Sequence, residues 1–153
     1  MHQEDTVTKR NGTKESISFD KILNRIKSLG DGLSINFTSL TKKIIDRLYD
    51  EIPTTLIDEL TAQQCASLST THPDYGTLAS KILISNCHKN TDGNFLQICE
   101  KLYQFKDIHN NQSSILSDKQ IELIRKNYTD YENMIDYKRD YLIDYFGFKT
   151  LER

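Results

Sequence analysis

Apolar positions in the first 90 residues predict a short β-hairpin followed by four helices. Two short stretches with β propensity flank Asn11-Gly12, a pair typical of a type I′ hairpin turn because both central positions of that turn need φ > 0. Apolar residues then recur with the helical period over residues 20–29, 39–50, 56–70 and 74–89. We therefore expect residues 1–91 to form a hairpin and a four-helix bundle.

Several residues mark the ends of these helices. Gly30 follows the first helix at the C′ position, where glycine commonly ends a helix. Thr54 and Thr55 each offer an N-cap for the third helix. Thr55 and Asp58 are spaced like a capping box, with Asp in place of Glu. Pro73 suits the first position of the fourth helix.

The pattern after Thr91 predicts further helices and no strand. A helix is expected over residues 92–105, then a polar loop over 106–116 and a helix opened by the capping box Ser117-Asp118-Lys119-Gln120. A tyrosine-rich stretch follows, and the sequence ends at Arg153 with no stop signal, as if within an element. The expected fold is mainly α with a small N-terminal β-hairpin, with residues 92–153 as a truncated helical region.

Composition and charge exclude several classes of function. The chain has 153 residues with 37% apolar and 27% charged, which fits one domain, or two small ones, and is too apolar for a disordered chain. Its 20 Lys and Arg against 22 Asp and Glu argue against a nucleic-acid binder held by overall charge. The apolar runs are too short to span a membrane. Three cysteines without a CxxC pair and four scattered histidines favour a cytoplasmic protein with reduced thiols and no metal site.

The sequence contains no nucleophile–base set and no glycine-rich phosphate loop. A bound phosphate would therefore need cationic side chains. Lys9 and Arg10 precede the hairpin turn, and Lys21 lies in the first turn of a helix, where N–H groups attract anions. Lys89 ends the fourth helix, a position that favours a cation in any case. Each of these residues also fits an ordinary solvated surface, so the residues alone leave a phosphate site open.

Longer motifs add a resemblance to a known family. The first 90 residues resemble an ATP-cone, the nucleotide-sensing module at the N-terminus of ribonucleotide reductase large subunits. The motifs are Val7-Thr8-Lys9-Arg10-Asn11-Gly12, Phe19-Asp20-Lys21-Ile22, Thr70-Thr71-His72-Pro73-Asp74-Tyr75 and Ile84-Ser85-Asn86-Cys87-His88-Lys89. Residues 134–140 and 145–153 are similar to the stretch that leads into the ten-stranded catalytic barrel of the class I large subunit, of eukaryotic and viral type.

The resemblance implies a regulatory role for residues 1–91. ATP would bind as an activating allosteric effector and dATP as an inhibitory one, which favours an inhibited oligomer. Asp58 matches the acidic position through which eukaryotic-type cones respond to dATP, and Asn11 departs from the Asp of many relatives. The positions that match the family's nucleotide-binding residues are Lys9, Arg10, Glu15, Ser16, Ile17, Ser18, Phe19, Asp20, Lys21, Thr54, Asp58 and Lys89.

The resemblance also implies a parent enzyme, a ribonucleoside-diphosphate reductase that supplies deoxyribonucleotides for DNA synthesis. Its partners would be a radical-generating small subunit and further copies of the large subunit. Cys65, Cys87 and Cys99 match no catalytic cysteine of the family, so we expect them to be core thiols and this segment alone to be inactive. Two alternatives remain: a stand-alone, catalytically inactive ATP-cone module from a truncated gene, and a degenerate cone that binds nothing.

Overall fold

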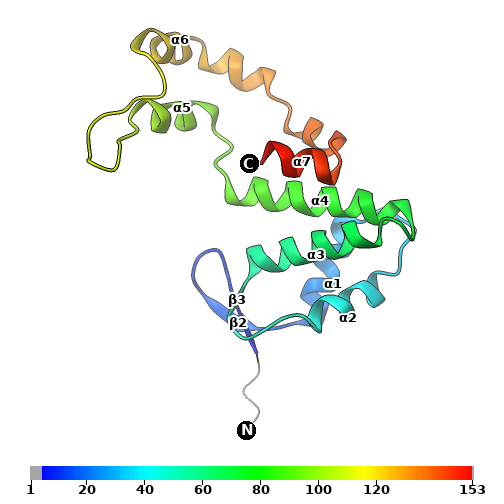
Figure 1. Cartoon of the computed structure of the whole chain (residues 1–153). Helices are drawn as coiled ribbons and strands as arrows, with labels where there is room; N and C mark the ends of the chain where they lie inside the picture. Colours follow the sequence, from blue (N-terminus) through cyan, green and yellow to red (C-terminus); the bar gives the residue numbers. More distant parts are fainter. Residues whose placement is uncertain (1–4, 153) are drawn as a thin grey trace. The chain divides into compact units, whose positions relative to one another are not determined.

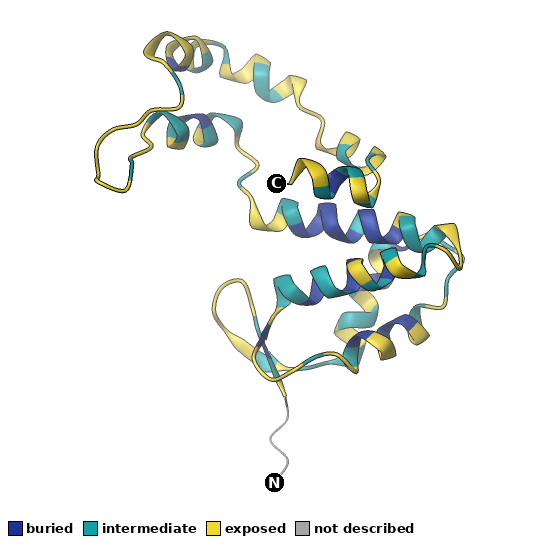
Figure 2. Ribbon diagram, viewed as in Figure 1, coloured by how far each residue is buried: buried dark blue, intermediate teal, exposed yellow. Residues whose placement is uncertain are grey.

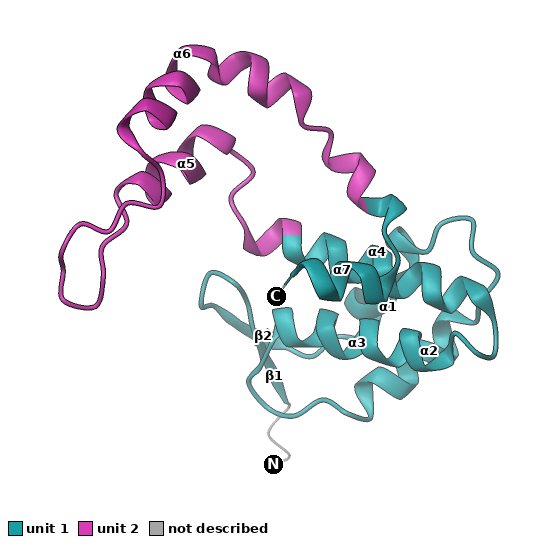
Figure 3. Ribbon diagram, turned by 45° about the horizontal axis from the view of Figure 1, so that its top comes forward, with its two compact units in different colours: residues 1–87, 141–153 teal, residues 88–140 magenta. Residues whose placement is uncertain are grey.

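The computed structural model describes residues 5–152, which fall into two compact units (Figure 3). The first unit consists of two stretches of the chain, one up to Cys87 and one from Tyr141 onward. The second unit is His88–Asp140. The mainly helical fold with a small N-terminal sheet is confirmed (Figure 1).

A small sheet opens the first unit. Strands β1 (Thr6–Thr8) and β2 (Lys14–Ser16) pair antiparallel, which confirms the predicted hairpin. A third strand, β3 (Ile52–Pro53), pairs parallel with β1 and gives the order β2-β1-β3. Strand β3 was not predicted from the sequence, because two residues are too few to show a period.

The hairpin turn differs from the predicted type I′ turn. Gly12 N donates to Lys9 O at 2.9 Å, and Lys9 N donates to Thr13 O at 2.8 Å. Gly12 has φ +80°, whereas Asn11 does not have positive φ. This is a type I turn followed by a left-handed glycine with a bulge. The Asn11 side chain accepts hydrogen bonds from Thr13 N and Oγ1, at 3.1 and 2.7 Å, and so stabilises this form locally.

Four helices follow in the first 90 residues, as predicted. They are α1 (Phe19–Leu29), α2 (Phe37–Ile45), α3 (Thr54–Leu68) and α4 (Pro73–Asn90). Helix α2 ends five residues before its predicted end, and Tyr49, which the predicted helix included, lies outside it and is 53% exposed. The chain turns there to reach β3: Glu51 has φ +64°, and the Asp50 carboxylate accepts hydrogen bonds from Thr6 N and Oγ1, both at 2.8 Å.

Two predicted helix-end signals act in other ways. Gly30 caps α1, but its φ of −93° is open to any residue. Glycine is needed there because a Cβ would lie 2.4 Å from the Phe37 ring. At α3, Pro53 occupies the N-cap and no side-chain hydrogen bond caps the helix. The predicted caps at Thr54 and Thr55 and the capping box with Asp58 are therefore wrong.

The core of the first unit lies between the sheet and its helices, with α4 as the most buried element (Figure 2). Helix α7 (Tyr145–Leu151) also belongs to this unit and lies beside α4 in both views (Figures 1 and 3). Phe148 of α7 is 9% exposed and joins the core, and Ile143 and Tyr145 pack against it. Residues far beyond the first 90 thus complete this core.

The second unit is built on α5 (Phe95–Tyr103) and α6 (Asp118–Met134). The capping box of Ser117 and Gln120 is present, as predicted. Glu100 accepts two hydrogen bonds from Arg125, at 2.6 and 2.8 Å, which joins the two helices. A 3₁₀ helix, η1 (Tyr137–Leu142), follows. Among the described residues, no helix combines the length and apolar character that a membrane crossing requires.

Candidate functional site

Two lysines from different elements meet on one carboxylate beside the hairpin. Lys9 Nζ lies 2.6 Å and Lys21 Nζ 2.8 Å from Glu15 Oε2. Lys9 precedes the turn, Glu15 is on β2, and Lys21 is in the first turn of α1, so the cluster joins the hairpin to the helix. The side chains of Lys9 and Lys21 are 42% and 65% exposed.

A second cluster, more deeply buried, surrounds Asp58 of α3. Arg25 Nη2 lies 3.1 Å from Asp58 Oδ2, and Arg25 Nε lies 3.4 Å from Oδ1. Arg10 Nη2 contacts the same Oδ2 at 3.5 Å. Arg25 also donates to Ser85 Oγ of α4 at 3.0 Å. Asp58 is 7% exposed, and these contacts join the hairpin, α1, α3 and α4 around one carboxylate.

Asn86 connects this cluster to the start of α3. Its Oδ1 accepts a hydrogen bond from Arg10 Nη2 at 2.5 Å, and its Nδ2 donates to Thr55 O at 3.3 Å. Asn86 is 3% exposed, so its amide is fixed between the hairpin turn and the first turn of α3. Because Lys21 and Arg25 are four residues apart on α1, the two clusters share one face of that helix.

The other predicted residues occupy the junction of the hairpin with α1 and two helix ends. Ser18 is the N-cap of α1 and accepts a hydrogen bond from Lys21 N at 3.4 Å. Thr54 is the first residue of α3, and Lys89 is exposed in the last turn of α4, within the second unit. At the junction, Ser16 ends β2, Ile17 packs against the core, Phe19 begins α1, and Asp20 is exposed in its first turn.

Arg25, Ser85 and Asn86 were not among the predicted site residues. Arg25 lies inside α1, among the apolar residues that predict this helix. A single arginine in an amphipathic helix suggests only that it belongs to the solvent-exposed side. A usable signal was present nevertheless. Asp58 falls between Ile57 and Thr61 on the buried side of α3, and a buried carboxylate needs a cationic partner.

The electrostatics of the two clusters favour an anionic ligand. Four cationic side chains face two carboxylates, so these two clusters contain more positive than negative groups. Hydrogen bonds from Lys21 and then Lys9 hold the pKa of Glu15 below its usual value. The lysines are thus compensated by a carboxylate that a more highly charged anion can replace.

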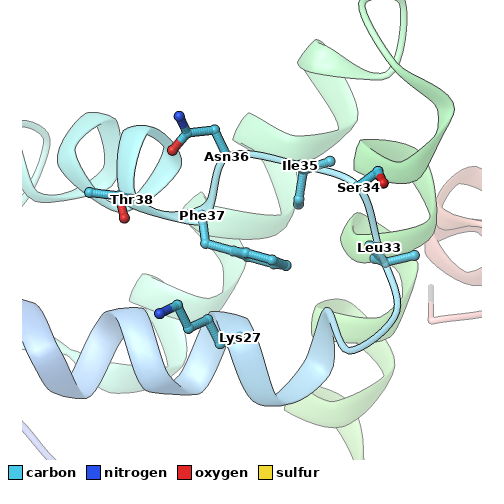
Figure 4. Close-up of a pocket in the computed structure, with 7 residues that line it drawn as sticks. All are labelled: Lys27, Leu33, Ser34, Ile35, Asn36, Phe37 and Thr38. Carbon is cyan, nitrogen blue, oxygen red and sulfur yellow. The ribbon is translucent and has the colours of Figure 1, made fainter.

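Two surface hollows lie elsewhere on the first unit. A hollow of about 580 Å³ is lined by the α1–α2 connection, with the Phe37 ring and Lys27 at its sides (Figure 4). Another of about 330 Å³ is lined by Asp5, Ile17, Ile45 and Leu48. Of the predicted nucleotide-binding residues, Ile17 lines the second hollow. The charged side chains of the Glu15 and Asp58 clusters are not among the lining residues of either hollow.

The cysteines and the metal-ligating residues point to no further chemistry. Cys65 and Cys99 are buried and Cys87 is half-buried. Burial raises the pKa of Cys65 to about 12, as expected for a thiol that acts as a small apolar core residue. Within residues 5–152 no three His, Cys, Asp or Glu side chains are grouped so as to hold a metal ion.

Comparison with known proteins identifies the class of this domain. The family model described as "ATP cone domain" matches residues 5–90, which contain both clusters. The chain therefore belongs to the ATP-cone family, a family of nucleotide-binding regulatory modules, and the resemblance inferred from the sequence is confirmed.

The relatives narrow the resemblance further. The chain is similar to ribonucleoside-diphosphate reductase large subunits from Plasmodium falciparum (isolate Dd2), with 42% identity, and Caenorhabditis elegans, with 40% identity. Large chain 2 of the same enzyme from Saccharomyces cerevisiae is also 40% identical. Each match covers 96% of this chain but only 18%, 19% and 17% of the respective relative. The chain thus corresponds to the N-terminal region of these large subunits and spans less than a fifth of their length.

Proposed function

We propose that this chain is the regulatory N-terminal part of a ribonucleoside-diphosphate reductase large subunit and that its cone binds ATP and dATP. The observation that carries the proposal is the convergence of four cations from the hairpin and α1, within an ATP-cone, around only two carboxylates. A triphosphate is the kind of ligand that such an excess of positive charge suits.

The geometry suggests how the nucleotide would be held. Lys9 and Lys21 are long, partly exposed side chains that can leave Glu15 and close on a phosphate. Helix α3 begins without a side-chain cap, so the N–H groups of its first turn, next to Thr54, can bind an oxygen of the nucleotide. Lys89 would add a cation from the end of α4.

Asp58 would distinguish the two effectors. It is a buried carboxylate among groups that would face the nucleotide, and a carboxylate accepts a hydrogen bond from a sugar hydroxyl. ATP and dATP differ by one such hydroxyl. The proposed regulation follows from this difference: ATP sustains activity, and dATP favours an inhibited oligomer.

Calorimetric titration of the 153-residue chain with ATP and dATP tests the binding. We expect competitive, saturable binding of both nucleotides. Lys89→Ala should weaken it by about 1.5–3 kcal/mol, the scale of a hydrogen bond to a charged group. Lys42→Ala, on the exposed side of α2, is the matched control and should bind as the wild type does. Absence of saturation with either nucleotide at millimolar concentration would refute the sensing role.

The regulatory half of the proposal needs the full-length reductase. There, Asp58→Asn should relieve inhibition by dATP and leave activation by ATP. Unchanged inhibition in this variant would contradict the role given to Asp58.

The parent activity, the small-subunit partner and the homo-oligomer are part of the same proposal. The 153 residues themselves are expected to be inactive in ribonucleotide reduction. Reading the coding DNA beyond residue 153 tests this assignment, because a continuing frame should encode the barrel and its cysteines. A stop codon there would instead favour the stand-alone nucleotide-sensing module.

A further inference from the structure

Arg25 of α1 contacts both oxygens of the Asp58 carboxylate. Its Nε lies 3.4 Å from Oδ1, and its Nη2 lies 3.1 Å from Oδ2. The same Nη2 donates to Ser85 Oγ of α4 at 3.0 Å. A guanidinium that contacts both oxygens fixes the plane of a carboxylate as well as its position, which a single contact does not do. Arg25 thus orients Asp58 relative to α1 and α4.

Arg10 contacts the same carboxylate from the hairpin and is itself held in place by Asn86. Arg10 Nη2 lies 3.5 Å from Asp58 Oδ2 and donates to buried Asn86 Oδ1 at 2.5 Å. Its contact with Asp58 is long and reaches one oxygen, so it does not fix the plane of the carboxylate. The orientation of Asp58 therefore depends on Arg25 more than on Arg10.

The two oxygens of Asp58 differ in the hydrogen bonds that they accept. A carboxylate has about four acceptor positions, two on each oxygen. Among the described residues, Oδ2 has two donors, Arg25 Nη2 and Arg10 Nη2, whereas Oδ1 has one, Arg25 Nε. One acceptor position thus remains on Oδ1. The Asp58 side chain is 10% exposed, and the position on Oδ1 suits a single further donor such as a hydroxyl group.

We propose that Arg25 is a positioning residue for effector discrimination: it holds Asp58 so that Oδ1 accepts the sugar hydroxyl that ATP has and dATP lacks. This inference deepens the proposed function and rests on it. The positive charge of Arg25 attracts both triphosphates equally, so that contribution cancels in the ratio Kd(dATP)/Kd(ATP). The orientation of Asp58 affects ATP alone and therefore changes this ratio.

Titration calorimetry of the complete 153-residue chain with ATP and with dATP measures the ratio. Arg25→Gln removes both contacts to Asp58 and should lower Kd(dATP)/Kd(ATP) by about tenfold or more, the loss of one hydrogen bond to a charged group. Arg25→Lys keeps the charge but loses the two-point contact, so it should lower the ratio by about threefold or more. Lys27→Gln removes an exposed cation two residues further along α1 and is the matched control, with an unchanged ratio.

The ratio separates positioning from other roles of Arg25. A residue that only stabilises the fold, or only adds charge, would leave the wild-type ratio in both variants, and this result would overturn the inference. The double variant Arg25→Gln/Asp58→Asn should have a ratio within about threefold of that of Asp58→Asn, because Arg25 then has no carboxylate to orient. A further tenfold decrease in the double variant would show that Arg25 itself contacts the sugar, which would also overturn it.

The design keeps the two proposals apart. A wild-type chain that binds neither nucleotide refutes the proposed function, and the inference falls with it. If Asp58→Asn keeps the wild-type ratio, the role proposed for Asp58 is refuted, and so is that of Arg25. If Asp58→Asn changes the ratio and the Arg25 variants do not, the inference alone is refuted. Should Arg25→Gln fail to fold, Arg25→Lys decides, because a wild-type ratio in this variant would contradict a role for the two-point contact.

Discussion

Replacement of Phe148 by alanine should destabilise the core of the ATP-cone, although Phe148 lies outside the residues that the family model matches. Phe148 is 9% exposed and packs into the core of the first unit from α7, 58 residues beyond the end of the ATP-cone match at residue 90. Truncation of a buried Phe to Ala costs about 3–5 kcal/mol. We expect a value near the lower end, about 3 kcal/mol, because the ring lies at the edge of the core.

A loss of that size is large but should leave the chain folded. Folded protein domains typically have unfolding free energies of about 5–15 kcal/mol. At about 2–4 °C per kcal/mol for chains of 150–250 residues, the melting temperature should fall by about 6–12 °C. Urea denaturation followed by circular dichroism should show a lower midpoint, and amide exchange in α4 should accelerate, since α4 belongs to the same core.

The same helix supplies the matched control. Phe146 is two residues away and 70% exposed, so Phe146→Ala should change stability by less than about 0.5 kcal/mol. Equal losses in the two variants, or no change in α4 exchange in Phe148→Ala, would refute the packing of α7 on the cone core.

Two further predictions concern single ionisable groups. The pKa of Glu15 is lower in the folded state than in the unfolded state because of Lys21 and Lys9, so its ionised form stabilises the fold above the unfolded pKa, and this contribution is lost as the pH falls through the folded pKa. The difference in urea midpoint between wild type and Glu15→Gln should therefore shrink from about pH 5 to about pH 3, and a constant difference would contradict the ion pairs. Burial raises the pKa of Cys65 to about 12, so iodoacetamide at neutral pH should label half-buried Cys87 well before Cys65; equal labelling of native protein would show that Cys65 is accessible.

Much of the fold could be predicted from the sequence because its signals are local. Helices α1 to α4 follow from apolar periodicity, and the capping box at Ser117 marks the start of α6 within one turn. Pro73 begins α4 as expected, since its fixed φ suits a first helical position. The hairpin followed from Asn11-Gly12, although the side chain of Asn11 favours a different turn type.

The features that could not be predicted depend on contacts distant in sequence. Strand β3 exists because β1 offers it a free edge, and α2 stops early because Asp50 must reach Thr6. The helical period cannot show that Asp58 bonds with Arg25 of another helix instead of capping its own. The residues Lys9, Glu15 and Lys21 were named from the family resemblance, as were the distant Asp58 and Lys89. Ser85 and Asn86 were missed because their partners Arg25 and Arg10 lie 60 and 76 positions away in the sequence.

The parallel pairing of β1 with β3 has a consequence for the order of folding. The pair Thr6–Asp50 closes a separation of 44 residues, and Arg10–Asn86 closes one of 76. Such contacts form after local helices and hairpins, because the entropy of closing a long loop must be overcome first. We therefore expect the hairpin and the single helices to form early, and the Asp58 cluster to close only when α4 docks. During synthesis, a chain whose Asn86 has not yet left the ribosome could form the Lys9–Glu15–Lys21 cluster but not the complete cluster around Asp58.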